Sequence, residues 1–248
     1  AVTFGRLTPS FMVMSPFLAF LPLITASPQE SLQLRINPPL GKVIEYATRF
    51  EAASADGTRT ARGQFLIAER AIAQGANFRF NRYVSAVTID GVLVPIKEGE
   101  EMKSLAGKTF PLLVTSTGNV IKGKRGKYEN DSSKIPNFIP RYPRIIVPGQ
   151  KVENGLDDMG GVAMTLREVR SYASGRAAIF SLENNLGREG SLSGTLLVSV
   201  EDGLPLALEL SVNPSASSRD QVQDIRIIHR RLNVPGLDRL TADLKLTD

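Results

Sequence analysis

The sequence contains no cysteine and no tryptophan, and it has a single histidine, His229. Without cysteine the chain has no disulfide, no thiol nucleophile and no thiolate metal ligand. A lone histidine has no second histidine with which to share a metal, so we interpret His229 as a hydrogen-bonded or solvated side chain. No Gly-x-Ser-x-Gly motif accompanies it, which argues against a serine hydrolase. We therefore expect no enzymatic activity, no metal site and no cofactor.

The positive charge is modest in total and concentrated in one segment. The 248 residues carry a net charge of +5, and the stretch from Lys122 to Lys151 holds eight basic and two acidic residues. Few aromatic residues are interleaved with these cations, so we expect no nucleic-acid partner. The spacing of a phosphate-binding P-loop is also missing. We instead expect contact with an anionic envelope surface, made by Lys122, Lys124, Arg125 and Lys127.

The amino end has the pattern of an export signal. Arg6 is its only charged residue, and the following apolar segment, residues 11–24, contains Ser15 and two prolines. A helix of that length reaches about 21 Å, whereas the hydrocarbon layer of a membrane is about 30 Å thick. We therefore predict a signal peptide or leader over residues 1–26, no transmembrane span, and a periplasmic or extracellular bacterial protein. The alternatives are a buried amino-terminal strand and a vector-derived leader.

Two-residue alternation of apolar and polar side chains dominates the rest of the chain, as is typical of antiparallel sheets. The clearest hairpin joins Leu196, Val198 and Val200, through a turn at residues 201–203, to a strand with apolar side chains on one face. These are Leu204, Leu206, Leu208, Leu210 and Val212. Turn sequences at 56–57, 90–91, 117–119 and 174–175 indicate further hairpins. Alternation at Leu240, Ala242, Leu244 and Leu246 predicts a closing strand.

This pattern predicts a mainly β fold: a strongly curved antiparallel sheet or incomplete barrel, with few short helices. Regular alternation is interrupted between two halves, which we place at residues 28–122 and 152–248, by a basic, proline-rich connector at 123–151. The alternative is a β-sandwich of two similar halves. Residues 64–74 fit a helical face or a strand face equally well, and periodicity does not decide between them.

The apolar faces of these strands are the candidate ligand site. If the sheet curls incompletely, one face lines a concave pocket that suits an acyl chain. The alternative is that the same side chains form an ordinary core. The candidate ligand-binding residues are Phe78, Phe80, Leu112, Val114, Leu196, Val198, Leu206 and Leu208.

Four segments carry a resemblance to known proteins: residues 105–110 (LAGKTF), 117–120 (TGNV), 147–150 (VPGQ) and the hairpin at 191–212. Together they resemble exported bacterial β-rich proteins of unknown function, whose organisation is similar to the lipoprotein-carrier (Lol-type) fold. The resemblance covers residues 32–248. It implies a strongly curved antiparallel sheet that wraps helices and encloses an apolar cavity for acyl chains.

These observations favour an exported, non-enzymatic protein that binds a hydrophobic or amphipathic ligand, such as a lipid, in a concave β-sheet. The alternative is a cell-envelope scaffold or protein-interaction module with a filled core and no ligand. Its partners would then be an envelope protein or an anionic envelope surface.

Overall fold

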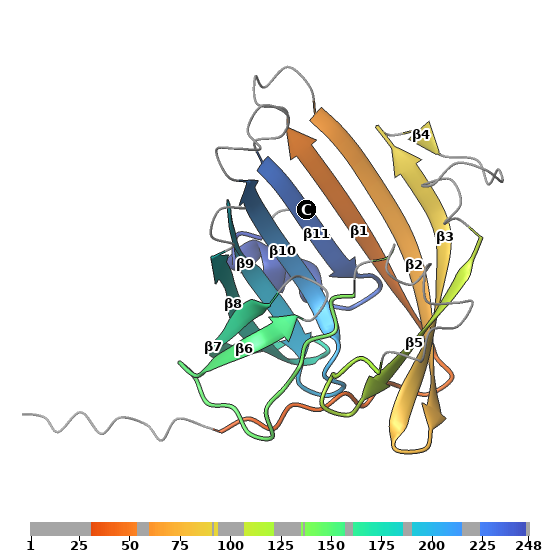
Figure 1. Cartoon of the computed structure of the whole chain (residues 1–248). Helices are drawn as coiled ribbons and strands as arrows, with labels where there is room; N and C mark the ends of the chain where they lie inside the picture. The colour runs from red at the N-terminus through yellow and green to blue at the C-terminus, as the bar shows by residue number, and fades with distance from the viewer. Residues whose placement is uncertain are drawn as a thin grey trace, which may run out of the picture.

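The computed structural model describes residues 31–53, 60–90, 92–93, 107–121, 135, 137–156, 161–185, 190–214 and 224–246. In this part of the chain eleven strands form a single antiparallel sheet, and one short helix, α2 (Leu237–Asp243), follows the last strand (Figure 1). The prediction of a mainly β, antiparallel fold is therefore confirmed. The strands belong to one sheet, and not to the two packed sheets of the sandwich alternative.

The sheet joins both halves of the sequence. Its order is β4-β3-β2-β1-β11-β10-β9-β8-β7-β6, and β5 pairs with β3 beside β4. The first strand pairs with the last, placing Tyr46 opposite Arg231, whereas β4 and β6 at the two ends do not pair with each other among the described residues. The sheet is therefore open. Its strands are β1 (Val43–Ala53), β2 (Thr60–Gln74), β3 (Asn77–Ile89), β4 (Val92–Leu93), β5 (Thr109–Thr115), β6 (Lys151–Leu156), β7 (Val162–Tyr172), β8 (Gly175–Asn185), β9 (Gly190–Ser199), β10 (Pro205–Pro214) and β11 (Asp224–Arg231).

The segment at 64–74, which periodicity left open, is a strand. It lies within β2, which pairs with β1 over residues 60–70 and with β3 over residues 63–74. Ile67 and Ala71 are buried in the main core, while the side chain of Ile72 is exposed. Two partner strands satisfy the backbone N–H and C=O groups of this segment, which decides in favour of the strand.

The predicted hairpin of β9 and β10 is confirmed, with one correction. Gly203 has φ +69° in its turn, a conformation that glycine adopts without strain. Pro205 lies opposite Val198 and Ala207 opposite Leu197, so Leu206 is an extra residue in β10. This bulge turns Leu206 to the other face of the sheet, away from Leu208. The five apolar residues expected on one face therefore do not all share it.

The predicted closing strand at 240–246 is wrong. Residues 237–243 form α2, and Leu237, Leu240 and Thr241 are its buried side chains, while Ala242 is exposed. Spacings of three and four residues produce one helical face, and Leu240 and Leu244 fit this period as well as the two-residue one. The helix packs on a second, smaller apolar cluster formed by Ala177, Ile179, Leu197, Leu206 and Ala207.

The main core lies on the opposite face of the sheet and is covered by two segments without regular secondary structure. We call them the covering segments, residues 31–42 and 137–150. Leu34 and Ile36 of the first are 1% exposed, and Ile146 of the second is fully buried. These side chains belong to the same apolar cluster as the inward-facing residues of the strands. The described part of the predicted connector thus contributes to the core.

Backbone hydrogen bonds attach the covering segments to each other and to separate parts of the sheet. Leu32 and Ile146 form a two-way bridge, with N···O distances of 2.7 and 2.9 Å. The Asn37 N–H donates to the Asp202 carbonyl oxygen in the β9–β10 turn, and the Arg141 N–H donates to that of Gly155 in β6. Because the polar backbone groups have partners, these irregular segments can lie against an apolar core.

Among the glycines of the described residues, Gly118 makes the closest approach to a covering segment. A Cβ atom there would lie 1.8 Å from the carbonyl oxygen of Pro140, and the residue has φ +84°. Gly149 has φ +83° but no heavy atom within 4 Å of the equivalent position. We expect Gly149→Ala to cost about 1–2 kcal/mol of unfolding free energy from the backbone conformation alone.

Gly118→Ala should lower the unfolding free energy clearly more than Gly149→Ala does, because the added methyl group also displaces the second covering segment. Denaturant titrations of the two variants measure this difference. Equal losses for the two variants would contradict this packing.

Candidate functional site

The predicted ligand-binding residues are buried side chains of the core. Phe80, Val114, Leu196 and Val198 are fully buried, and Leu112 and Leu208 are 8% and 1% exposed. Phe78 is partly buried against the same cluster. The structure therefore brings seven of the eight residues together on one face, while Leu206 packs with α2 on the other face.

The space over this face is occupied by the chain itself. Besides Leu34, Ile36 and Ile146, the apolar cluster includes Phe138, Ile139 and Tyr142 from the second covering segment and also Ile135. The Tyr142 hydroxyl donates a 2.7 Å hydrogen bond to the carbonyl oxygen of Gly203, which fixes the segment on the β9–β10 turn. The inward-facing residues thus contact protein side chains where an acyl chain was expected.

Phe78 differs from the other predicted residues because it lines an opening at the surface. The pocket has a volume of about 370 Å³ and lies between the first covering segment and the sheet. Its remaining lining is mostly polar, from Gln33, Arg35, Ile36, Asn37, Ser116, Val200 and Glu201. Such a lining suits a polar contact better than an acyl chain.

Two other predicted features lie outside the described residues. These are the leader at residues 1–26 and the four cations Lys122, Lys124, Arg125 and Lys127. No helix in the described ranges is long and apolar enough to cross a membrane.

A buried ion pair lies within the apolar core. Glu69 on β2 and Arg82 on β3 are directly opposite each other, and Arg82 Nε donates to Glu69 Oε1 at 2.7 Å. Their side chains are only 7% and 4% exposed. Arg82 also donates a longer, 3.4 Å hydrogen bond to the carbonyl oxygen of Ile135. The pair neutralises both charges, which would be costly to bury alone.

His229 is buried beside this pair and held by aromatic and polar neighbours. Its ring stacks on Tyr46, with centroids 4.6 Å apart, and also contacts Phe138. Its Nδ1 lies 2.7 Å from Thr48 Oγ1, on the neighbouring strand. Burial and, to a smaller extent, the charge of Arg82 lower the pKa of His229 from 6.5 to about 3. The imidazole is therefore neutral at neutral pH, in keeping with a hydrogen-bonded structural role.

Tyr46 completes this group of polar side chains. Burial raises its pKa well above the usual value of 10, and the nearby carboxylate of Glu69 adds to the rise. Its hydroxyl is buried without a hydrogen-bond partner in the described part of the chain. The phenol therefore stays protonated at neutral pH and cannot serve as a general base.

The buried polar group, which we define as Tyr46, Thr48, Glu69, Arg82 and His229, was missed by the sequence analysis. A signal for part of it was present. Phe78, Phe80, Arg82 and Val84 alternate along one strand, so the two-residue period that places the phenylalanines inward also places Arg82 inward. A cation on a predicted apolar face requires a buried partner.

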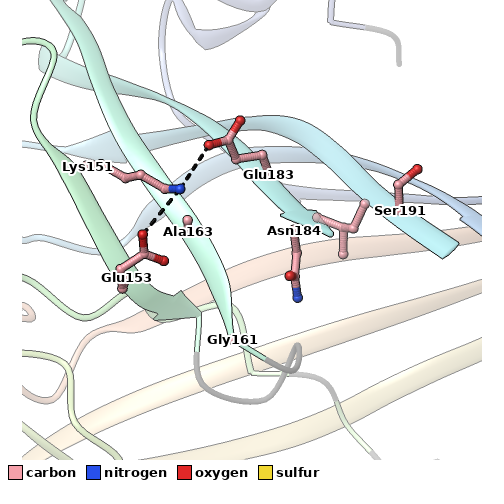
Figure 2. A pocket seen from close by; sticks show the side chains of 8 residues that line it. Lys151, Glu153, Gly161, Ala163, Glu183, Asn184 and Ser191 are labelled. Carbon is pink, nitrogen blue, oxygen red and sulfur yellow. Dashed lines mark ion pairs between the residues drawn. The ribbon is translucent and has the colours of Figure 1, made fainter. Parts of the chain in front are cut away.

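A shallow polar pocket lies on the outer face of β6–β9, with a volume of about 540 Å³. Lys151 and Glu183 approach each other across Ala163, whose small side chain leaves the hollow open (Figure 2). Lys151 Nζ is 3.2 Å from Glu153 Oε1 and 3.3 Å from Glu183 Oε1. These hydrogen bonds, the one to Glu153 first, raise the pKa of Lys151. The amine stays protonated and is not activated as a nucleophile.

The described residues contain no cluster of three or more His, Cys, Asp or Glu that could hold a metal ion. Comparison with known proteins adds no relative: no family model matches the chain, and no curated protein matches it significantly.

The depressed pKa of His229 predicts a pH dependence of stability. Between pH 7.5 and 5 the unfolded chain takes up a proton at this residue, with a pKa of about 6.5, while the folded protein does not. Stability contributed by the neutral ring is therefore complete above pH 6.5 and is lost as the pH falls toward 3. We expect the wild type to lose about 2 kcal/mol more than His229→Phe over this pH interval.

Urea titrations of both proteins at pH 7.5 and 5 measure this difference. Phenylalanine keeps an aromatic ring stacked on Tyr46. Any loss of packing in this variant lowers the unfolding free energy by the same amount at pH 7.5 and at pH 5, and so does not affect the comparison. An identical pH dependence in the two proteins would show that His229 is not buried in the neutral form.

The buried ion pair predicts strong non-additivity. Arg82→Met leaves the Glu69 carboxylate without its partner and should cost about 3–5 kcal/mol of unfolding free energy. The double variant Glu69→Leu/Arg82→Met buries no charge and should recover most of this loss. Denaturant titrations of the two single variants and the double variant complete the cycle. Purely additive losses would mean that the charges do not interact in the folded protein.

Proposed function

We propose that this protein is a non-enzymatic interaction module of the bacterial cell envelope, with a filled core and no ligand inside its sheet. One observation supports this proposal above the others: the apolar face that would hold a ligand is covered by the chain's own residues 31–42 and 137–150. Leu34, Ile36 and Ile146 are at most 1% exposed there. A lipid could enter this space only if the covering segments left the sheet.

The surroundings of this face support the same proposal. Hydrogen bonds at Asn37, Arg141 and Tyr142 attach the covering segments to the sheet, so their displacement would break polar as well as apolar contacts. In this proposal the open sheet curves around the covering segments as an incomplete barrel. The segments take the place that helices and a cavity have in the lipoprotein-carrier fold. The envelope location rests on the apolar amino-terminal sequence at residues 11–24.

The absence of an internal ligand is directly measurable on the full chain. We expect native mass spectrometry to give the mass of the polypeptide alone, and solvent extraction of the purified protein to yield no stoichiometric lipid. Bound lipid at a constant ratio to protein would overturn the filled-core proposal and favour the carrier.

A pair of core variants tests the same point without any ligand. Phe80, a predicted ligand residue, and Phe180, a core residue of β8, are both fully buried. In a filled core, either change to alanine leaves a cavity and costs about 3–5 kcal/mol of unfolding free energy. If Phe80 instead lined an empty ligand cavity, Phe80→Ala would cost far less than Phe180→Ala in the ligand-free protein.

A further inference from the structure

The outer face of β1, β2, β3 and β5, opposite the main core, carries exposed apolar side chains next to arginines. The register places Val43 opposite Arg70, and Ile72 opposite Arg79. Val43, Ile72 and Tyr83 are 51%, 40% and 41% exposed. Exposed aliphatic side chains that adjoin one another mark a contact surface, whereas isolated ones do not.

The row through Arg79 continues across the edge of the sheet. Arg79 lies opposite Leu113 on β5, and the Ile121 N–H donates to the Leu113 carbonyl oxygen. Ile121 is 38% exposed. Of the six large apolar side chains that are exposed in the described ranges, four thus lie on this one face. We call it the basic-apolar face: Val43, Arg70, Ile72, Arg79, Tyr83 and Ile121.

The charge on this face has one sign at its centre. Arg70 and Arg79 are exposed and form no ion pair with any described residue. Glu45 also lies on this face of β1, opposite Ala68 and in the same cross-strand row as Tyr83, and it accepts a hydrogen bond from the Asn233 side chain. The hollow on the outer face of β6–β9, by contrast, contains two acids, Glu153 and Glu183, and one cation, Lys151. The two parts of the outer surface therefore differ in charge.

We propose that the basic-apolar face docks on an anionic lipid surface. Guanidinium groups bind phosphate oxygens in a bidentate manner, and Arg70 and Arg79 stand between the aliphatic side chains. Val43, Ile72 and Ile121 then enter between the headgroups, and Tyr83 sits at the boundary with its ring in the apolar part and its hydroxyl in water. This inference rests on the proposed interaction module and specifies the partner of its surface.

Charge variants with a matched control test the proposal by flotation of the full chain with vesicles. The vesicles are phosphatidylcholine alone, or phosphatidylcholine with about one-third phosphatidylglycerol, at about 0.1 M salt. Arg70→Gln/Arg79→Gln should weaken binding to the anionic vesicles about fivefold for each charge removed. Arg167→Gln/Arg239→Gln removes the same charge from exposed positions elsewhere and should stay within about twofold of wild type.

The apolar component has its own matched pair. Ile72→Thr removes an aliphatic side chain from the basic-apolar face but keeps a β-branched residue, and should weaken binding about fivefold. Ile145→Thr makes the same change at a residue that is 53% exposed outside this face, and should bind as the wild type does. The amino-terminal segment and the cations at 122–127 are common to all variants and do not affect the comparison.

Equal weakening by the test and control pairs, or wild-type binding that does not depend on phosphatidylglycerol, would overturn the membrane proposal. So would a wild type that binds no vesicles and instead captures a protein partner through this face. In each case, if native mass spectrometry gives the mass of the polypeptide alone, the filled-core proposal is unaffected. Lipid retained at constant ratio would overturn the filled core instead, whatever the vesicles show.

Discussion

The constraint that shapes this protein is the need to cover the apolar face of an open sheet. An antiparallel sheet with one hydrophobic face must bury it against another layer. Here that layer is neither a helix nor a second sheet but two irregular segments, whose Leu34, Ile36 and Ile146 complete the core. Their backbone groups bond to each other and to strand ends, which is what permits loops to occupy a core position.

The two-residue period was sufficient to predict most of the sheet, because a half-buried strand alternates directly in its sequence. The period gave wrong predictions where the same apolar residues also fit a helix and where a bulge changed the alternation. Leu240 and Leu244 fit both a strand and a helix, and the helical choice follows from packing against Leu197 and Leu206, which periodicity does not contain. The face of the sheet on which Leu206 lies is set by a bulge in β10, which only the strand pairing reveals. The sequence also did not reveal the role of the second covering segment, since residues 137–150 have no regular period.

The buried polar group shows what sequence reasoning about sites overlooks. Motif and spacing analysis examined His229 as a ligand or a base, although its environment is set by Tyr46 and Thr48, about 180 residues away in the chain. These residues meet because β1 pairs with β11. Arg82 was more accessible to prediction, since its parity with Phe80 places it inward, but its partner Glu69 required knowledge of the β2–β3 register.

That register connects the interior to the outer surface. The pairing of β2 and β3 already contains one register shift, between Leu66 and Ile67. A further one-residue slip would exchange the faces of β3, burying Arg79 and Tyr83 while exposing Phe80 and Arg82. Such a slip would also separate Arg82 from Glu69 and leave the buried carboxylate of Glu69 without a partner. We infer that the ion pair contributes mainly to the choice of register, and through it determines which side chains the outer face presents.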